Sequence, residues 1–207
     1  AWVGLFAEFA ECFDIKADKN KLFSTLYQKA MEGDKDCGGM IACNYYSGEP
    51  VTGLEEGRPM FLRRPDSHLG LANFMRSHLY ASLATLKIGL DILLKEEDVK
   101  IDSITGHGGL FKTKGVGQSI LAAAMNAPIS VMETAGEGGA WGMALLAAYM
   151  LSKKDGQSLG DYLDSRVFAE RKSETMEPDL ADVAGFETYT KQYQACLAAE
   201  KAAVQAF

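Results

Sequence analysis

The stretch from residue 101 to residue 152 constrains the fold most, because it runs strand, glycine turn, helix twice in succession. The apolar residues 101–105 end at a cluster of glycines, and a helical pattern follows over residues 113–126. A second apolar stretch, 129–132, again leads through glycines into an uncharged helical pattern at 140–152. Strands that alternate with helices are typical of an α/β protein with one main sheet. The uncharged helix is expected to lie in the core.

Two helices and two short strands are expected before this stretch. The first helix should bury an aromatic face whose members stand three or four residues apart, namely Trp2, Phe6, Phe9 and Phe13. Asp18 is expected to be the N-cap of a second helix, which stops at Gly33. Residues 40–46 and 60–62 are apolar and bounded by turns, which favours strands.

A long helix is expected over residues 71–93, because leucines and one methionine recur there at spacings of three and four. They predict a core-facing stripe made of Leu71, Met75, Leu79, Leu83, Leu86, Leu90 and Leu93. The remainder is more polar, with a weak helix over 159–167, a charged loop over 170–178 and an alanine-rich helix from about Asp182.

Composition excludes several classes of protein. The 207 residues carry a net charge of −7 and no basic block, which argues against nucleic acid or an anionic membrane as a partner. The four cysteines have no C-x-x-C spacing, so we expect reduced thiols in a cytoplasmic protein and neither a zinc site nor disulfides. Residues 140–151 are too few to cross a bilayer. The chain starts at Ala1 directly in a helical pattern, so we expect a piece of a longer protein.

The glycine turn after residue 105 is the strongest candidate for a ligand site. Glycines let backbone N–H groups approach a ligand closely, and a following helix start adds unpaired donors, which suits phosphate or a nucleotide. Thr113 is expected to start the helix, where its hydroxyl can cap it or contact a ligand, and Lys112 and Lys114 add positive charge. The simpler alternative is that the glycines only form tight turns. No G-x-x-x-x-G-K-[ST] motif is present, and the dinucleotide fingerprint is incomplete.

Candidates for acid–base chemistry are few. His68, His78 and His107 are far apart in the sequence, and only His107 lies within the glycine turn. Glu49 and Glu137 also occupy glycine-rich turns, where a solvated carboxylate is the commoner case. No serine, cysteine or threonine has the context of a catalytic triad. We therefore predict no catalytic residue in this chain.

These residues together resemble the carboxyl-terminal lobe of the FGGY carbohydrate kinases. The resemblance rests on ITGHGG at 104–109, VME at 131–133 and AWGMA at 140–144, in that order and spacing. NYYSGE at 44–49 looks like the aromatic–Ser–Gly–Glu turn best known from xylulose kinases, and NFMRSHL at 73–79 stands where the family signature enters its long helix. The resemblance covers residues 1–152 well and the tail loosely.

The resemblance implies an α/β lobe of the actin-like, ribonuclease-H-like ATPase fold, with one mixed sheet flanked by helices. It implies that the lobe binds ATP, with Mg²⁺ held by the nucleotide phosphates. Gly108 and Gly109 would pack against the nucleotide, Leu110 and Thr113 would flank the adenine, and Gly4 would face it from the other side. The family often has alanine, serine or asparagine where this chain has Leu110, Phe111 and Thr113.

The same resemblance implies one domain over residues 1–207, with a core over 1–152, a helical tail over 153–207 and the amino-terminal, sugar-binding lobe absent. The longer protein would phosphorylate a ketopentose such as xylulose or ribulose, and the chain alone would be inactive. A severed lobe should expose apolar surface, most simply on the first helix, and a homodimer is one outcome. The alternatives are a stand-alone nucleotide-binding or regulatory module of the same superfamily, and a purely structural domain.

Overall fold

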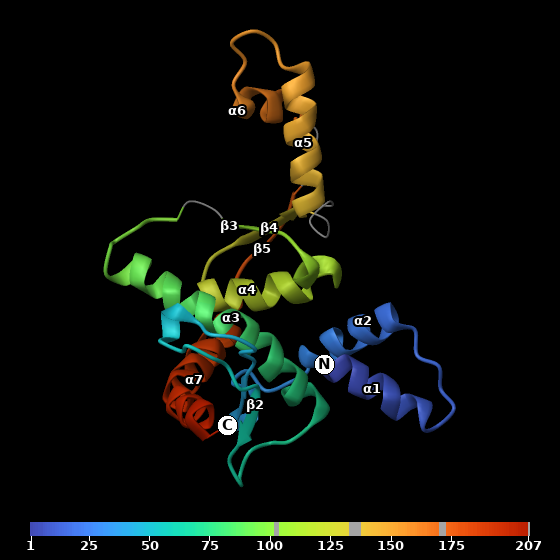
Figure 1. Cartoon of the computed structure of the whole chain (residues 1–207), viewed down its shortest axis with the longest axis vertical. Helices are drawn as coiled ribbons and strands as arrows, with labels where there is room; N and C mark the ends of the chain where they lie inside the picture. The colour runs from blue at the N-terminus through green and yellow to red at the C-terminus, as the bar shows by residue number, and fades with distance from the viewer. Residues whose placement is uncertain (102–103, 133–137, 170–172, 207) are drawn as a thin grey trace.

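The computed structural model describes residues 1–101, 104–132, 138–169 and 173–206 (Figure 1). The helices are α1 (Trp2–Glu11), α2 (Lys19–Ala30), α3 (Leu71–Lys95), α4 (Val116–Met125), α5 (Gly138–Ser152), α6 (Leu159–Tyr162) and α7 (Leu180–Ala206). The strands are β1 (Met40–Cys43), β2 (Met60–Arg63), β3 (Ile104–Gly106), β4 (Ile129–Met132) and β5 (Ser173–Met176). Short turns of other helix types are η1 (Cys37–Gly39), η2 (Pro50–Thr52), η3 (Gly109–Lys112) and η5 (Leu163–Val167).

The larger sheet is mixed, as expected. Its order is β3-β4-β5, with β3 parallel to β4 and β5 antiparallel to β4. Strand β5 lies in the segment that the sequence predicts as a charged loop. Its side chains are exposed except for the half-buried Met176, so it lacks the apolar alternation that identifies a strand. Pairing of Met176 with the buried Ile129 of β4 sets the register.

Strands β1 and β2 form a separate antiparallel pair, in which Met40 faces Arg63 and Cys43 faces Met60. Both strands were expected, although β1 ends three residues earlier than the predicted segment over 40–46. All of β1 is buried, because α3 and α7 pack against it. The N-cap at Asp18 is confirmed, since its side chain accepts a hydrogen bond of 2.7 Å from the backbone N–H of Lys21.

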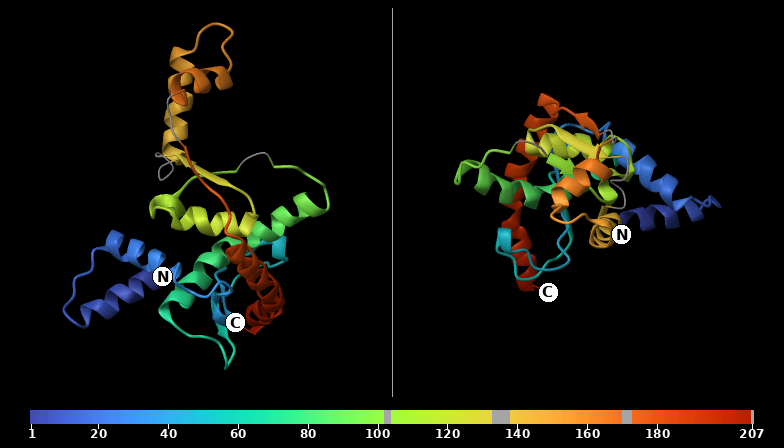
Figure 2. Two further views of the ribbon diagram at one scale, coloured as in Figure 1. Left: turned by 180° about the vertical axis from the view of Figure 1, so that it is seen from behind. Right: turned by 90° about the horizontal axis from the view of Figure 1, so that it is seen from above.

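Helix α4 occupies the centre of the molecule. It lies under the three-stranded sheet and packs on its other side against α3 and α7 (Figures 1 and 2). Except for Ser119, every residue of α4 is buried. The carboxyl-terminal helix α7 completes this core with three buried aromatic residues, Phe186, Tyr189 and Tyr193. The Tyr189 hydroxyl donates to the carbonyl of Ser77 at 3.0 Å, which ties α7 to α3.

The expected stripe on the long helix is only partly buried. Met75, Leu79 and Leu83 lie in the core, whereas Leu71, Leu86 and Leu93 are exposed. Helix α3 therefore contacts the core in its first half and extends beyond it afterwards. A buried ion pair anchors the packed half: Arg76 of α3 donates to Asp182 of α7, and it also bonds the Tyr80 hydroxyl at 2.8 Å.

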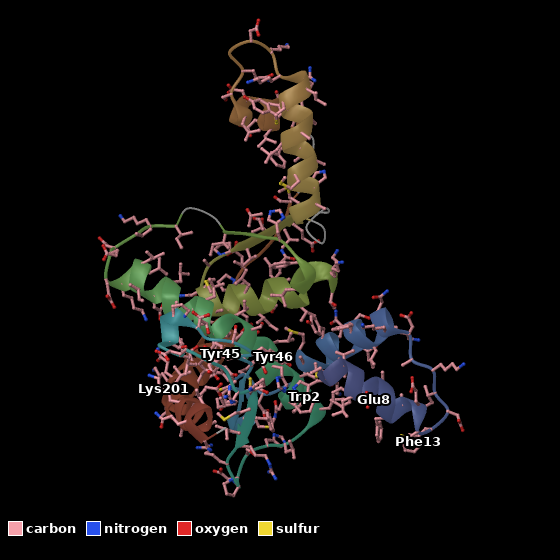
Figure 3. The ribbon with its side chains drawn as sticks, in the orientation of Figure 1. Trp2, Glu8, Phe13, Tyr45, Tyr46 and Lys201 are labelled. Atoms are coloured by element: carbon pink, nitrogen blue, oxygen red, sulfur yellow. The ribbon has the colours of Figure 1, made fainter. Side chains whose placement is uncertain are left out.

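The aromatic face of α1 is not in the core, which corrects the sequence-based expectation. Trp2 packs edge-on against Phe74 of α3, with ring centroids 4.9 Å apart. Phe9 and Phe13, however, are each 63% exposed and contact mainly each other. Figure 3 shows Trp2 at the end of α1 next to α3 and Phe13 at its far end. The helical periodicity was right, but only the first two turns, with Trp2 and Phe6, pack against Phe74 of α3.

Helix α5 was expected in the core, and this prediction is wrong. None of its residues is buried. Figures 1 and 2 show α5 and α6 extending together away from the helices around α4. One face of α5 packs on the short helices that follow it, with the rings of Tyr149 and Tyr162 5.4 Å apart. The opposite face carries exposed methionine and leucine side chains, Met143, Met150 and Leu151.

Candidate functional site

The turn after β3 needs glycine at two positions for different reasons. A Cβ at Gly106 would lie 2.3 Å from Cζ of Phe111, so the Phe111 ring closes over the end of the strand. Gly108 has φ of 106° and ψ of −173°, a conformation that is essentially restricted to glycine. The chain then enters η3 and reverses toward α4. The turn is thus fixed by the packing of Phe111 and by one glycine-only conformation.

Gly109 is different, because nothing in the described structure requires a glycine there. A Cβ at Gly108 or at Gly109 would meet no heavy atom within 4 Å, and Gly109 is exposed without a positive φ. By contrast, a Cβ at Gly117 of α4 would lie 2.5 Å from the carbonyl oxygen of Leu110. The turn is therefore packed tightly on the side of α4, and no described residue covers its outer side. A bare backbone of this kind allows close approach by a ligand.

Helix α4 does not start at Thr113, as the sequence suggested, but three residues later. Thr113 ends η3 in an extended conformation, and its carbonyl accepts from the N–H of Val116 at 3.3 Å. The N-cap is Gly115, with φ of 80° and no side chain to cap the first turn. A glycine at this position leaves the first N–H groups of α4 without a side-chain acceptor.

A cavity of about 430 Å³ lies beside the turn, between η3, the start of α4 and the strands β4 and β5. Its wall contains Phe111, Thr113, Lys114, Gly115, Gln118, Val131, Met132, Ser173 and Glu174. Lys114 and Glu174, both exposed, pair at 3.2 Å at this cavity, so part of the positive charge expected there is neutralised. The cavity has both polar and apolar walls.

Gln118 connects the walls of this cavity. It was not identified as a site residue from the sequence. Its buried side chain donates to the carbonyl of Ile129 at 3.1 Å and to that of Glu174 at 2.8 Å. It thereby fixes α4 to β4 and β5 at once. Ser173 and Glu174 were missed as well, because the segment that contains them was expected to be a loop. A single buried glutamine in an apolar helix was the available signal.

A second cavity, of about 520 Å³ and mostly apolar, lies on the other side of the turn. His107, Met132, Gly138, Trp141, Gly142, Leu145, Leu146, Leu159, Leu163 and Phe168 form its wall. His107 is exposed and lies close to the start of α5, since a Cβ at Gly138 would be 3.1 Å from its Nδ1. His107 thus lines this cavity next to the glycine turn.

The remaining predicted binding residues are less close together. Leu110 lies in η3 and packs against the core from its partly buried position. Gly4 lies in α1, and Figures 1 and 2 show α2 between α1 and the start of α4. Helix α2 itself reaches the turn, because the Gln28 side chain donates to the carbonyl of Lys114 at 3.2 Å. Gly4 is open on its outer side, with no heavy atom within 4 Å of an added Cβ.

The other candidate carboxylates and histidines lie elsewhere. Glu49 caps η2 by accepting from the N–H of Val51 at 3.0 Å, whereas Glu137 lies outside the described residues. His68 pairs with Asp34 at 2.8 Å, and hydrogen bonds from Asn73 and His68 lower the pKa of that carboxyl.

The described residues contain neither a metal-binding cluster nor a membrane-spanning helix. Across residues 1–101, 104–132, 138–169 and 173–206, no group of three or more His, Cys, Asp and Glu side chains is placed to hold a metal ion. No helix in the described part of the chain is long and apolar enough to span a membrane. All four cysteines are free thiols.

Comparison with known proteins agrees with this fold. Residues 1–151 match the model of the FGGY family of carbohydrate kinases, C-terminal domain. The gluconate kinase from Lactobacillus acidophilus is 18% identical with a TM-score of 0.65 over 95% of this chain, and the xylulose kinase from Rhodospirillum rubrum is 18% identical with a TM-score of 0.61 over 87%. The glycerol kinase from Plasmodium falciparum, solved with ADP, is 17% identical with a TM-score of 0.57 over 96%. A search of curated proteins found no match.

The match accounts for a minor part of each solved kinase. The chain covers 34% of the Rhodospirillum xylulose kinase, 38% of the gluconate kinase and 37% of the glycerol kinase. Its α/β architecture with a mixed three-stranded sheet is that of the actin-like ATPase fold. The family model covers residues 1–151 of 207, which includes both glycine turns and α5. The chain belongs to the FGGY family of carbohydrate kinases, and residues 1–151 correspond to the family's C-terminal domain.

Proposed function

We propose that this chain is the ATP-binding lobe of a longer sugar kinase. The observation that carries the proposal is the open backbone of Gly108 and Gly109, where an added Cβ would meet no heavy atom of the described residues within 4 Å, next to a cavity of about 430 Å³. Phosphate groups suit such a surface, because unpaired N–H groups at a glycine turn and a helix start donate to anions. Mg²⁺ would then be held by the phosphates and not by side chains of this lobe.

The chemistry of the cavity wall favours one orientation of the nucleotide. Glu174 would repel phosphates, whereas its carboxylate and the Ser173 hydroxyl can accept hydrogen bonds from an amino group of adenine. Thr113 and Phe111 line the same cavity and offer apolar contact to the base. The base is therefore expected in this cavity and the phosphates over Gly108 and Gly109. Leu110 supports the turn from the core side, and the contact of Gly4 with the adenine remains a prediction.

The substrate is proposed to be a ketopentose such as xylulose or ribulose. Support comes from the SGE turn at 47–49, which resembles the corresponding turn of xylulose kinases. Phosphoryl transfer depends on positioning and on neutralising charge across a closed site, and one lobe provides only the nucleotide side of that site. The four free thiols suit a reducing compartment such as the cytoplasm.

The test is a calorimetric titration with ATP and with ADP, which measures nucleotide affinity. It is made on the parent chain and on the variant Gly109→Val. The variant should fold, because a valine side chain fits at this position. Gly109 has no positive φ, and no heavy atom lies within 4 Å of an added Cβ. The valine would nevertheless cover the backbone that the phosphates approach, so we expect affinity to fall at least about tenfold. Gly70→Val is the matched control, since Gly70 is also exposed and open at its Cβ position, but lies before α3.

Equal nucleotide affinity in Gly109→Val and the parent chain would reject the site. Gly4→Val, at another open position, tests the predicted contact from α1 in the same assay. A coupled assay of ADP release with D-xylulose, D-ribulose and L-ribulose should show no turnover by the chain alone. Clear turnover would mean that the chain is a complete kinase and not one lobe. Nucleotide binding that changes affinity for a protein, without any sugar phosphorylation by the longer protein, would favour the regulatory module instead.

A further inference from the structure

One atom of the Gln118 amide has no partner in the described part of the chain. Gln118 is buried, with 5% of the residue exposed, and its Nε2 donates to the carbonyls of Ile129 and Glu174 at 3.1 and 2.8 Å. A primary amide has two N–H groups, so these bonds use both of them. The remaining atom, the carbonyl oxygen Oε1, bonds no described residue. Because Gln118 lines the cavity of about 430 Å³ beside the glycine turn, Oε1 is the group that it offers there.

The same two carbonyls fix the orientation of this amide. If the amide were flipped, Oε1 would face two carbonyl oxygens, and the N–H groups would face the cavity. Three acceptors would then stand together without a donor, which costs free energy in a buried place. Gln118 therefore presents an acceptor to the cavity and cannot exchange it for a donor. A buried acceptor without a partner points to a ligand that brings an N–H group.

The rest of the cavity wall agrees with a flat ligand that carries a donor. Lys114 is the one charged donor in this wall, and its ammonium pairs with the exposed Glu174 carboxylate at 3.2 Å. The buried end is a neutral amide, which suits a neutral amino group better than a cation. Three half-buried apolar side chains also line the cavity: Phe111, Val131 and Met132. Their surfaces can contact the faces of a heterocyclic ring while Oε1 accepts at its edge.

We propose that Gln118 determines which nucleobase this cavity accepts, by bonding an exocyclic amino group. The inference rests on the proposed function, which puts the base in this cavity. The amino group of adenine donates to Oε1. Hypoxanthine is the same purine with a carbonyl oxygen in place of that amino group, so Oε1 would meet a second acceptor and both would be left unpaired. Glu174 lies at the exposed rim of the cavity, whereas Gln118 acts at its buried end.

ATP and ITP differ by this one group, so their affinities isolate the contact. A site that bonds an N–H group of its ligand discriminates against an analogue without it, because a buried group of the site is then left unpaired. We expect the chain to bind ATP at least about tenfold more tightly than ITP. Calorimetric titrations of the chain with each nucleotide, at one Mg²⁺ concentration, measure this ratio.

Gln118→Met removes the contact and keeps the length of the side chain. A thioether is only a weak acceptor, so the preference for ATP over ITP should fall to less than about threefold. If Gln118 served only to connect α4 with β4 and β5, the variant would weaken both nucleotides alike and leave their ratio unchanged. The ratio in the parent chain does not depend on how well the variant folds, so it tests the proposal by itself.

Two further variants are controls. Gly109→Val should weaken ATP and ITP by the same factor, because it acts on the phosphates, which the two nucleotides share. Ser119→Ala changes the next residue of α4 and should leave both affinities unchanged, because Ser119 does not line the cavity.

Equal affinity of the parent chain for ATP and ITP would overturn the inference and leave the proposed function intact. A preference for ATP that is as strong in Gln118→Met as in the parent chain would also overturn it, because another group would then select the base. Binding of neither nucleotide would reject the proposed function and this inference together.

Discussion

Gly106 and Gly109 are three residues apart, yet the structure constrains them differently. At Gly106 the Phe111 ring leaves no space for a side chain, whereas at Gly109 the space is open. Both glycines look the same in the sequence motif. The motif therefore predicts the turn, but it does not show which glycine is required by packing and which one leaves space for a ligand. The structure makes this separation, and it also explains why Thr113 was misassigned: η3 is inserted between the turn and α4.

His78 gives a pH-dependent test at the residue scale. It lies among the rings of Trp2, Phe61 and Phe74, with Nδ1 donating to Oδ1 of Asn44 at 3.2 Å. Its buried Nε2 has no partner among the described residues. Burial, with a smaller contribution from the positive amino terminus, lowers the pKa of His78 to about 4.

The sign of the effect follows from the two protonation states. Between pH 6.5 and 4 the unfolded chain binds a proton at His78 that the folded chain excludes, so the free energy of unfolding falls as the pH falls through this window. Relative to His78→Leu, the loss should be about 2 kcal/mol at pH 4 after allowing for partial exposure of the ring. Urea unfolding at pH 7, 5.5 and 4 measures it. Parallel pH profiles for His78→Leu and the parent would contradict the prediction.

At the scale of elements, α4 and α5 show what sequence patterns leave open. Both helices are rich in alanine and other apolar residues and carry no charge, yet α4 is central and α5 projects from the body. Composition does not distinguish a central helix from a projecting one, because the burial of a helix depends on which other elements pack against it. Strands β3 and β4 could be predicted because each is a local apolar run beside a glycine or proline. Strand β5 could not, because its identity comes from pairing with β4 through a long connection.

The contact between α3 and α7 depends on a buried charge pair, which gives a prediction at this scale. Arg76 is 1% exposed and donates to Asp182, and Lys35 reaches the same carboxylate at 2.7 Å. Asp182→Ala would leave the buried guanidinium without its main counter-charge, which should cost about 3 kcal/mol of unfolding free energy. Chemical denaturation measures the loss.

The double variant Arg76→Met with Asp182→Leu is the informative companion. It replaces the pair by apolar side chains of similar size, so most of the stability should return. If the double variant is as unstable as Asp182→Ala, the effect comes from lost packing and not from an unpaired charge. Lys29→Ala, in an exposed ion pair with Glu32, should change stability by less than about 0.5 kcal/mol.

At the scale of the whole molecule, β5 and α7, both beyond residue 152, are part of the main body. β5 completes the sheet, and Phe186, Tyr189 and Tyr193 fill the core. The family match ends at residue 151, whereas the packed body also includes β5 and α7, which come later in the chain. Sequence reasoning identified the lobe from its local motifs but treated this segment as an appendage, because its contacts are all distant in the chain.

Truncation tests this view. A chain that ends at Glu177 lacks α7 and should show no cooperative unfolding transition by circular dichroism, because the buried side of α4 would lose its cover. A chain that ends at Ala202 should unfold like the parent, since residues 203–206, the described part of what it removes, are exposed or half-buried. Cooperative unfolding of the shorter chain with the parent's midpoint would show that α7 is dispensable.

The place of α7 in the core also fixes when the protein can fold during its synthesis. The hydroxyl of Tyr189 bonds the carbonyl of Ala42, 147 residues earlier in the chain. At about 5–20 residues per second, a ribosome needs roughly 7–30 s between these two residues. In the last part of that interval, once α4 is complete at Met125, β1 and α4 have been made but their covering helix has not. Until α7 is made, the nascent chain therefore presents an open apolar core to the solvent.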